Sequence, residues 1–154
     1  MNTVMDDFIE WADGLGIKVS IDHDELCIAS PLDDRSFVCK DALIAEAGDH
    51  TVSDTDFIDD FYQVIIDYLQ DTADDVTEDT DSYGYSDEIN WFFLSMFSHA
   101  VTVRLDGIND GDTSASAQVD AELRTYVVLM SGVNGELKDL ANSMRDIMIQ
   151  KLRN

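Results

Sequence analysis

Aspartate residues recur at short intervals along residues 54–75, where the apolar pattern predicts a helix. At about 100° per residue, five of them share an arc of about 60°, with Asp59 at its edge. These five are Asp56, Asp60, Asp67, Asp71 and Asp74. Like charges at such spacings destabilise a helix, and Asp is a poor helix former. Helix stability therefore does not explain the row, which has the chemistry of a surface that attracts cations and basic side chains.

The predicted carboxylate row has the dimensions of a short stretch of DNA. It spans about 27 Å at about 1.5 Å per residue, which is the length of about 8 base pairs at roughly 3.4 Å each. Two further acidic groups are expected to extend this surface. They are Asp6, Glu10 and Asp13 in the N-terminal helix, and Asp74, Asp75, Glu78, Asp79 and Asp81 after the row. We expect Lys and Arg of a DNA-binding protein to contact these carboxylates in place of phosphates.

The charge of the whole chain exceeds what solubility requires. Its 154 residues include 26 Asp and 7 Glu against 9 Lys and Arg, giving a net charge of -24. A magnitude of roughly 2 to 8 is enough to keep a small domain soluble. Nucleic acid and anionic membranes repel such a chain, which excludes both as direct ligands. The expected partner is a basic nucleic-acid-binding protein.

In size, acidic excess and helical placement of charge, the chain resembles the DNA-mimic inhibitors that phages and mobile elements use against restriction and CRISPR systems. These inhibitors share no motif and no common fold, so the resemblance transfers no residue. It implies a non-catalytic protein that blocks a restriction enzyme, a CRISPR effector or another basic DNA-binding protein. It also implies a cytoplasmic location, that of the host cell where a phage encodes the protein.

A high-salt habitat is the alternative explanation of the acidity, and the chain would then be an acidic interaction or assembly protein. Its lysines are few, as on halophilic surfaces; they are Lys18, Lys40, Lys138 and Lys151. Two features argue against this alternative. Glu is scarce, and residues 135–154 carry nearly balanced charge.

Calcium binding is a further alternative, because residues 79–90 partly match the EF-hand loop. Positions 1, 3, 6 and 9 of that loop are Asp79, Asp81, Gly84 and Asp87. Position 5 is Tyr83, however, and position 12 is Asn90, where a bidentate Glu belongs. The sequence therefore predicts no dedicated metal site.

Catalytic chemistry has weaker support. His23, His50 and His99 are scattered, and no glycine-rich phosphate loop or GxSxG motif is present. Cys27 lies near His23, but it alternates with apolar residues as a small strand residue would. Cys27 and Cys39 lack metal-ligand spacing and are expected to be reduced thiols. We predict neither enzymatic activity nor a cofactor.

Membrane insertion and export are not expected either. The chain has no run of 18 apolar residues, so no membrane-spanning helix is predicted. Residues 1–10 carry acid where an export signal needs Lys or Arg. These features predict an intracellular protein.

The elements that must position these residues follow from apolar periodicity. Helices are expected at 3–14, 42–47, from Ser53 as N-cap to about 72–74, at 87–97 and at 134–152. Strands are expected at 17–21, 25–29, 36–39, 101–105 and 119–127, the last two antiparallel across a loop at 107–116. Because helices and strands mix without regular βαβ alternation, the predicted class is α+β. Residues 1–154 are expected to form one domain, with amphipathic helices packed on a small antiparallel sheet.

The helix predicted at 87–97 is rich in large apolar side chains. Phe92, Phe93, Met96 and Phe97 lie close together in it. They are expected to form either core or the contact of a homodimer, and the sequence leaves both open.

Overall fold

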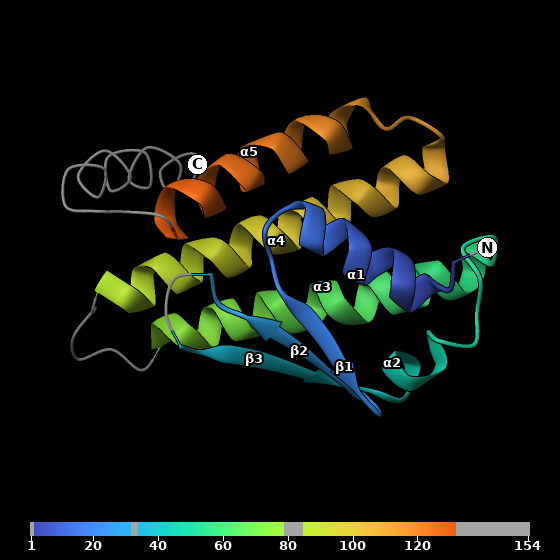
Figure 1. The fold of residues 1–154 in the computed structure, drawn as a ribbon, viewed down its shortest axis with the longest axis horizontal. Helices are drawn as coiled ribbons and strands as arrows, with labels where there is room; N and C mark the ends of the chain where they lie inside the picture. The colour runs from blue at the N-terminus through green and yellow to red at the C-terminus, as the bar shows by residue number, and fades with distance from the viewer. Residues whose placement is uncertain (1, 32–33, 79–84, 132–154) are drawn as a thin grey trace.

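The computed structural model describes residues 2–31, 34–78 and 85–131, and this part of the chain forms five helices and one three-stranded sheet (Figure 1). The elements in chain order are α1 Val4–Gly14, β1 Val19–Asp22, β2 Glu25–Ala29, β3 Ser36–Lys40, α2 Ala42–Glu46, α3 Thr55–Glu78, α4 Tyr85–Asp110 and α5 Ser114–Ser131. The predicted α+β class is confirmed. The helix predicted at 134–152 lies outside the described residues.

The first half of the chain follows its sequence pattern closely. Thr3 caps α1 by accepting a hydrogen bond from the Asp6 N–H. The sheet is antiparallel in the order β1-β2-β3. Its inward positions are buried and apolar; they include Leu26, Ile28, Phe37 and Cys39. Alternation along β2 and β3 therefore packs one face of the sheet on the helices, as expected.

The N-cap of α3 differs from the prediction by one residue. Asp54, not Ser53, accepts a hydrogen bond from the Phe57 N–H, at 3.2 Å. The Ser53 hydroxyl instead pairs with the Thr51 hydroxyl at 2.7 Å. His50 Nδ1 lies 2.8 Å from Asp54 Oδ2 and holds the pKa of that carboxyl below its usual value, together with the Phe57 N–H.

The predicted strands at 101–105 and 119–127 are wrong, since both segments are helical. In the first, Val101, Val103 and Leu105 alternate, but Phe97, Val101 and Leu105 also repeat every four residues and are buried. This repeat places them on one side of a continuous α4. Residues 101–105 are therefore helical despite their alternating pattern, because β propensity depends strongly on context.

The same ambiguity explains α5. The alternation of residues 119–127 includes Ala121 and Thr125, which are exposed, whereas Leu123, Tyr126 and Val127 are buried at helical spacing. The Thr125 hydroxyl donates to the Ala121 carbonyl, an i to i−4 bond that suits a helix. Residues 119–127 therefore add no strand to the sheet.

The loop predicted at 107–116 is also shorter than expected, because only residues 111–113 separate α4 from α5. Gly111 adopts a φ of +75° after α4. A Cβ on Gly107 would lie 2.8 Å from the Asp112 carbonyl oxygen, so this close turn requires glycine. The Asp112 carboxylate accepts from the Ser114 N–H, which lowers the pKa of Asp112.

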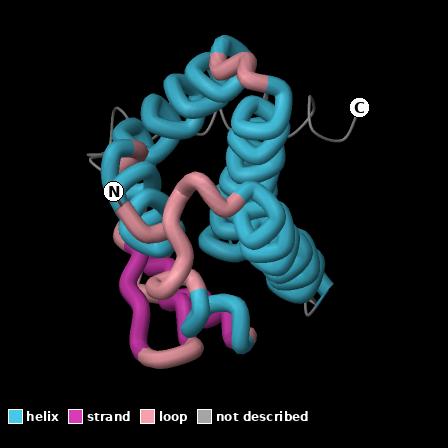
Figure 2. Tube along the Cα trace, turned by 90° about the vertical axis from the view of Figure 1, so that its right-hand side faces the viewer, coloured by secondary structure: helices cyan, strands magenta, loops and turns pink. Residues whose placement is uncertain are grey.

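The core lies where α1 packs on the antiparallel pair of α3 and α4, with the sheet and α2 to one side (Figure 2). The Phe8 ring contacts Phe61 and Tyr62 of α3 and Phe97 of α4, with centroids 5.7–6.2 Å apart. Of the aromatic group predicted in 87–97, Phe92, Phe93 and Phe97 are fully buried and Met96 is 7% exposed. This group therefore belongs to the core.

Candidate functional site

The carboxylates of the predicted row lie on the side of α3 that faces away from the core. The core side presents Phe57, Phe61, Ile65 and Leu69. The five residues of the predicted row are all exposed; they are Asp56, Asp60, Asp67, Asp71 and Asp74. We call these five the acidic ridge. Over its length, α3 carries eight acidic residues and neither Lys nor Arg, so the helix itself supplies no compensating cation.

Two hydrogen bonds distinguish the members of this helix surface. Asp59, at the edge of the predicted row, is half-buried and accepts from Asn109 Nδ2 at 2.9 Å. This bond ties α3 to the end of α4, so Asp59 has a structural role. Asp67 accepts from Gln63 Nε2 at 3.0 Å within α3, which orients its carboxylate at the surface.

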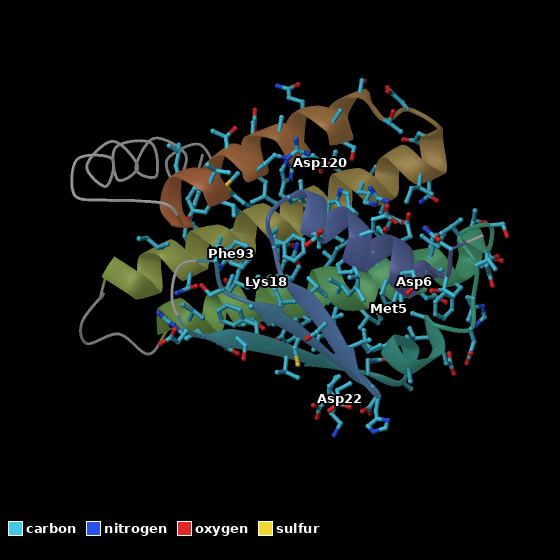
Figure 3. All side chains as sticks on the ribbon, in the orientation of Figure 1. Met5, Asp6, Lys18, Asp22, Phe93 and Asp120 are labelled. Atoms are coloured by element: carbon cyan, nitrogen blue, oxygen red, sulfur yellow. The ribbon has the colours of Figure 1, made fainter. Side chains whose placement is uncertain are left out.

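The predicted acids of α1 form a separate surface. Asp6, Glu10 and Asp13 are exposed and line a shallow hollow of about 520 Å³ beside Lys18. Figure 3 shows Asp6 on α1 and Lys18 at the entry to β1, at opposite ends of this region. Asp7, which the sequence does not distinguish from its neighbours, points to Arg104 instead.

The α1 acids and the acidic ridge lie on opposite sides of α3. The ring of Phe8 on α1 contacts Phe61 and Tyr62. At about 100° per residue, the mean direction of these two side chains is about 165° from that of the ridge. The α1 acids therefore do not lengthen the ridge, and the two sets of carboxylates cannot contact one flat surface together.

The acidic connection is only partly described. Asp75 is exposed, but it lies about 100° around the helix from Asp74. Glu78 is the last residue of α3. Asp79 and Asp81 lie outside the described residues, as does the first half of the EF-hand-like segment. Across residues 2–31, 34–78 and 85–131, no group of three or more His, Cys, Asp or Glu is placed to hold a metal ion.

A partly buried polar network joins four helices, and the sequence pattern did not predict it. The Arg104 guanidinium donates to Asp7 at 2.9 Å and to the Tyr62 hydroxyl at 3.0 Å. It also lies 4.9 Å from the ring centroid of Trp11. The Trp11 indole N–H donates to Asp120 Oδ2 at 3.0 Å. The only sequence signal was a lone Arg within an apolar helix.

Burial and charge oppose each other in this network. Burial lowers the pKa of Arg104, but Tyr62 and Asp7 more than offset that effect, so the pKa is raised and the guanidinium stays charged. Burial also raises the pKa of Tyr62, although Arg104 opposes this. Asp120, labelled between α5 and the other helices in Figure 3, keeps Oδ1 buried without a hydrogen-bond partner among the described residues. The network fixes α1 on the helices and has the features of a structural element.

The histidines and cysteines lie on separate elements. His23 occupies the β1–β2 turn, His50 precedes α3 and His99 lies on α4. Cys27 pairs with Val38 and Cys39 with Leu26, so the two thiols point to opposite faces of the sheet and both are free. Burial, with a smaller effect of Asp41, raises the pKa of Cys39 to about 11. This thiol is therefore a protonated core group.

A comparison of the chain with protein-family models, curated proteins and solved structures finds no match. In the part of the chain that the structure describes, no helix is long and apolar enough to cross a membrane. The acidic ridge and the α1 surface are the most strongly charged surfaces of the described residues that the sequence predicted.

Proposed function

We propose that this chain is a non-catalytic DNA mimic whose acidic ridge occupies the nucleic-acid-binding surface of a basic protein. The observation that carries the proposal is the ridge itself, a row of exposed carboxylates on a helix without cations. Its members contribute repulsion rather than packing. An exposed surface whose charges repel one another and that takes no part in the core is suited to a contact with another molecule.

The dimensions of the ridge support this function. Successive carboxylates four residues apart are separated by about 6 Å along the helix, which a basic groove that tracks phosphates can follow. The short Asp side chain keeps each charge close to the backbone, so the charges are well positioned. The net charge of -24 adds long-range attraction to a basic partner and speeds association.

The proposed inhibition is steric and competitive with DNA. The partner would be a restriction enzyme, a CRISPR effector or another DNA-binding protein in the same cytoplasm. The complex should weaken steeply with salt, because it replaces the phosphate contacts that give such proteins their salt dependence.

A capture experiment tests the proposal. The chain is immobilised, exposed to a DNase-treated bacterial lysate, and the captured proteins are identified and released with duplex DNA. The ridge variant carries Asp56→Asn, Asp60→Asn, Asp67→Asn and Asp71→Asn. The control variant carries Asp22→Asn, Asp34→Asn, Glu46→Gln and Asp49→Asn, which change four exposed acids outside α1 and α3.

We expect the native chain to capture DNA-binding proteins that DNA displaces. The ridge variant should bind them at least about tenfold more weakly, since a close interfacial charge pair couples by about 1.5 kcal/mol or more. The control variant, with the same net charge, should bind nearly as the native chain does. Equal loss of binding in both variants would mean that the total charge, rather than the ridge, attracts the partner. Failure of duplex DNA to displace the captured proteins would refute the mimic.

The acidic surface on α1 favours a second candidate, an interaction protein adapted to high salt. Acid on opposite sides of the domain is what general surface acidity predicts. Circular dichroism over a potassium chloride series separates the two candidates. A mimic is folded at about 0.1 M salt, where the Debye length is about 10 Å, whereas a halophilic protein requires far more salt to fold.

A further inference from the structure

A pocket opens between α3 and α4 directly beside the acidic ridge. It is a shallow hollow of about 480 Å³, similar in size and openness to the one on α1. Asp74, the last member of the ridge, contributes to its wall together with Gln70. Trp91 and His99 line it from α4. The pocket therefore joins a carboxylate, an amide and two aromatic rings at one end of the ridge.

One residue that lines the pocket has a buried hydroxyl without a partner among the described residues. Ser98 lines the pocket and is only 3% exposed, and its Oγ has no hydrogen-bond partner among the described residues. The nearby Thr102 hydroxyl donates to the Ser98 carbonyl, so it does not satisfy the Ser98 side chain. An unsatisfied buried hydroxyl costs free energy. Because the Ser98 Oγ has almost no exposed surface, a ligand in the pocket recovers that free energy only when the Ser98 side chain rotates toward it.

The charge around the pocket selects the kind of ligand. Eight carboxylates and no Lys or Arg lie on α3, and this repels phosphates and carboxylates. A cation is favoured. The wall offers oxygen acceptors on Asp74, Gln70 and Ser98 and the half-buried ring of Trp91. A planar guanidinium carries five N–H donors and stacks on aromatic faces, whereas an ammonium is a compact, more strongly hydrated charge.

We propose that this pocket binds an arginine side chain of the basic partner and anchors one end of the ridge on it. The inference rests on the proposed function for its biological partner, but the pocket chemistry can be measured without that partner. The ridge then supplies attraction at a distance, and the pocket supplies a specific contact that distinguishes Arg from Lys.

The test uses two probes of equal charge, the peptides acetyl-Gly-Gly-Arg-Gly-Gly-amide and acetyl-Gly-Gly-Lys-Gly-Gly-amide. Each is titrated into the ¹⁵N-labelled full chain at about 0.15 M potassium chloride, where screening over about 8 Å suppresses diffuse attraction. We expect the Arg peptide to shift the resonances of Asp74, Trp91, Ser98 and His99 in a saturable way. The Lys peptide should bind about tenfold more weakly, a difference of about 1.4 kcal/mol.

Two matched variants define the site. Asp74→Asn should weaken Arg-peptide binding by about tenfold, whereas Asp75→Asn, the same charge change about 100° around the helix, should leave it nearly unchanged. Ser98→Ala should weaken binding without lowering the melting temperature, because it removes a buried hydroxyl that had no partner.

Three results would each refute the proposal that the pocket binds arginine. They are equal binding of both peptides, resonance shifts spread along the whole ridge, and equal effects of Asp74→Asn and Asp75→Asn on binding. None of these results would affect the proposed function, because the capture experiment changes ridge residues that do not line the pocket. Conversely, Arg-selective binding at the pocket would stand even if duplex DNA failed to compete in the capture experiment.

Discussion

Neutralising the acidic ridge should stabilise the fold. The variant replaces Asp56, Asp60, Asp67 and Asp71 by Asn, which keeps side-chain shape and removes four charges. Asn at 67 retains the oxygen that accepts from Gln63. Because these residues are exposed and face away from the core, the substitution disturbs no packing. Its effect on stability is therefore electrostatic.

The magnitude follows from the positions of the charges on α3. Five pairs of acidic residues three or four positions apart each lose at least one charge. They are 56–59, 56–60, 67–71, 71–74 and 71–75. Relief of about 0.2–0.5 kcal/mol per pair amounts to about 1–2.5 kcal/mol. The Asp56 carboxylate also stabilises α3, because it lies in the first turn near the positive end of the helix dipole. Loss of its charge therefore subtracts about 0.3–1 kcal/mol from this gain. A net gain of about 1 kcal/mol raises the Tm by about 2–4 °C.

Thermal unfolding followed by circular dichroism at 222 nm measures this gain. It should be largest at about 0.05 M potassium chloride and nearly absent at about 1 M, where the Debye length falls to about 3 Å. A lower Tm for the variant in dilute salt would refute the reasoning, since it would mean that the carboxylates stabilise the native chain. A gain that is independent of salt would also contradict it, because packing would then be the cause.

Three further predictions concern residues away from the ridge. Arg104→Met should lower the free energy of unfolding by about 2–3 kcal/mol in urea titrations, because Asp7 is left partly buried and unpaired; an unchanged midpoint would contradict the network. Since the pKa of Cys39 is raised to about 11, only Cys27 should react with Ellman's reagent at pH 8 in the folded chain, and both thiols after denaturation. His23→Gly should add about 1 kcal/mol of stability, because glycine adopts a positive φ without strain, and a lower Tm would show that no strain is stored at His23.

The amphipathic pattern of the first 78 residues predicted their structure well. The helices near 3–14 and 42–47, the hairpin and the third strand all form, within a few residues of the expected bounds. In these segments the apolar period matches only one kind of element, and residues such as Thr3 cap it locally. The five ridge residues share an exposed face for the same reason, since the period of a helix determines which of its side chains point together.

Residues 101–127 were ambiguous because their apolar residues fit two periods. Val101, Val103 and Leu105 alternate as in a strand, yet the continuation of α4 buries Val101 and Leu105 against its neighbours. Which period prevails depends on the surface that each face meets, and only packing provides that surface. The sequence also gave no sign of the Arg104 network, because packing brings together its partners Asp7, Tyr62 and Trp11 from two other helices.

The sequence by itself determined the acidity of this protein and the exposed acidic face of α3, because charge is additive and helical phase is local. The tertiary structure decided what that charge can contact. The packing of Phe8 on Phe61 and Tyr62 places the α1 acids on the side opposite the ridge. The pairing of α3 with α4 places Ser98 and Trp91 beside Asp74. Neither arrangement has a local signal, because each depends on which apolar faces of distant segments bury one another.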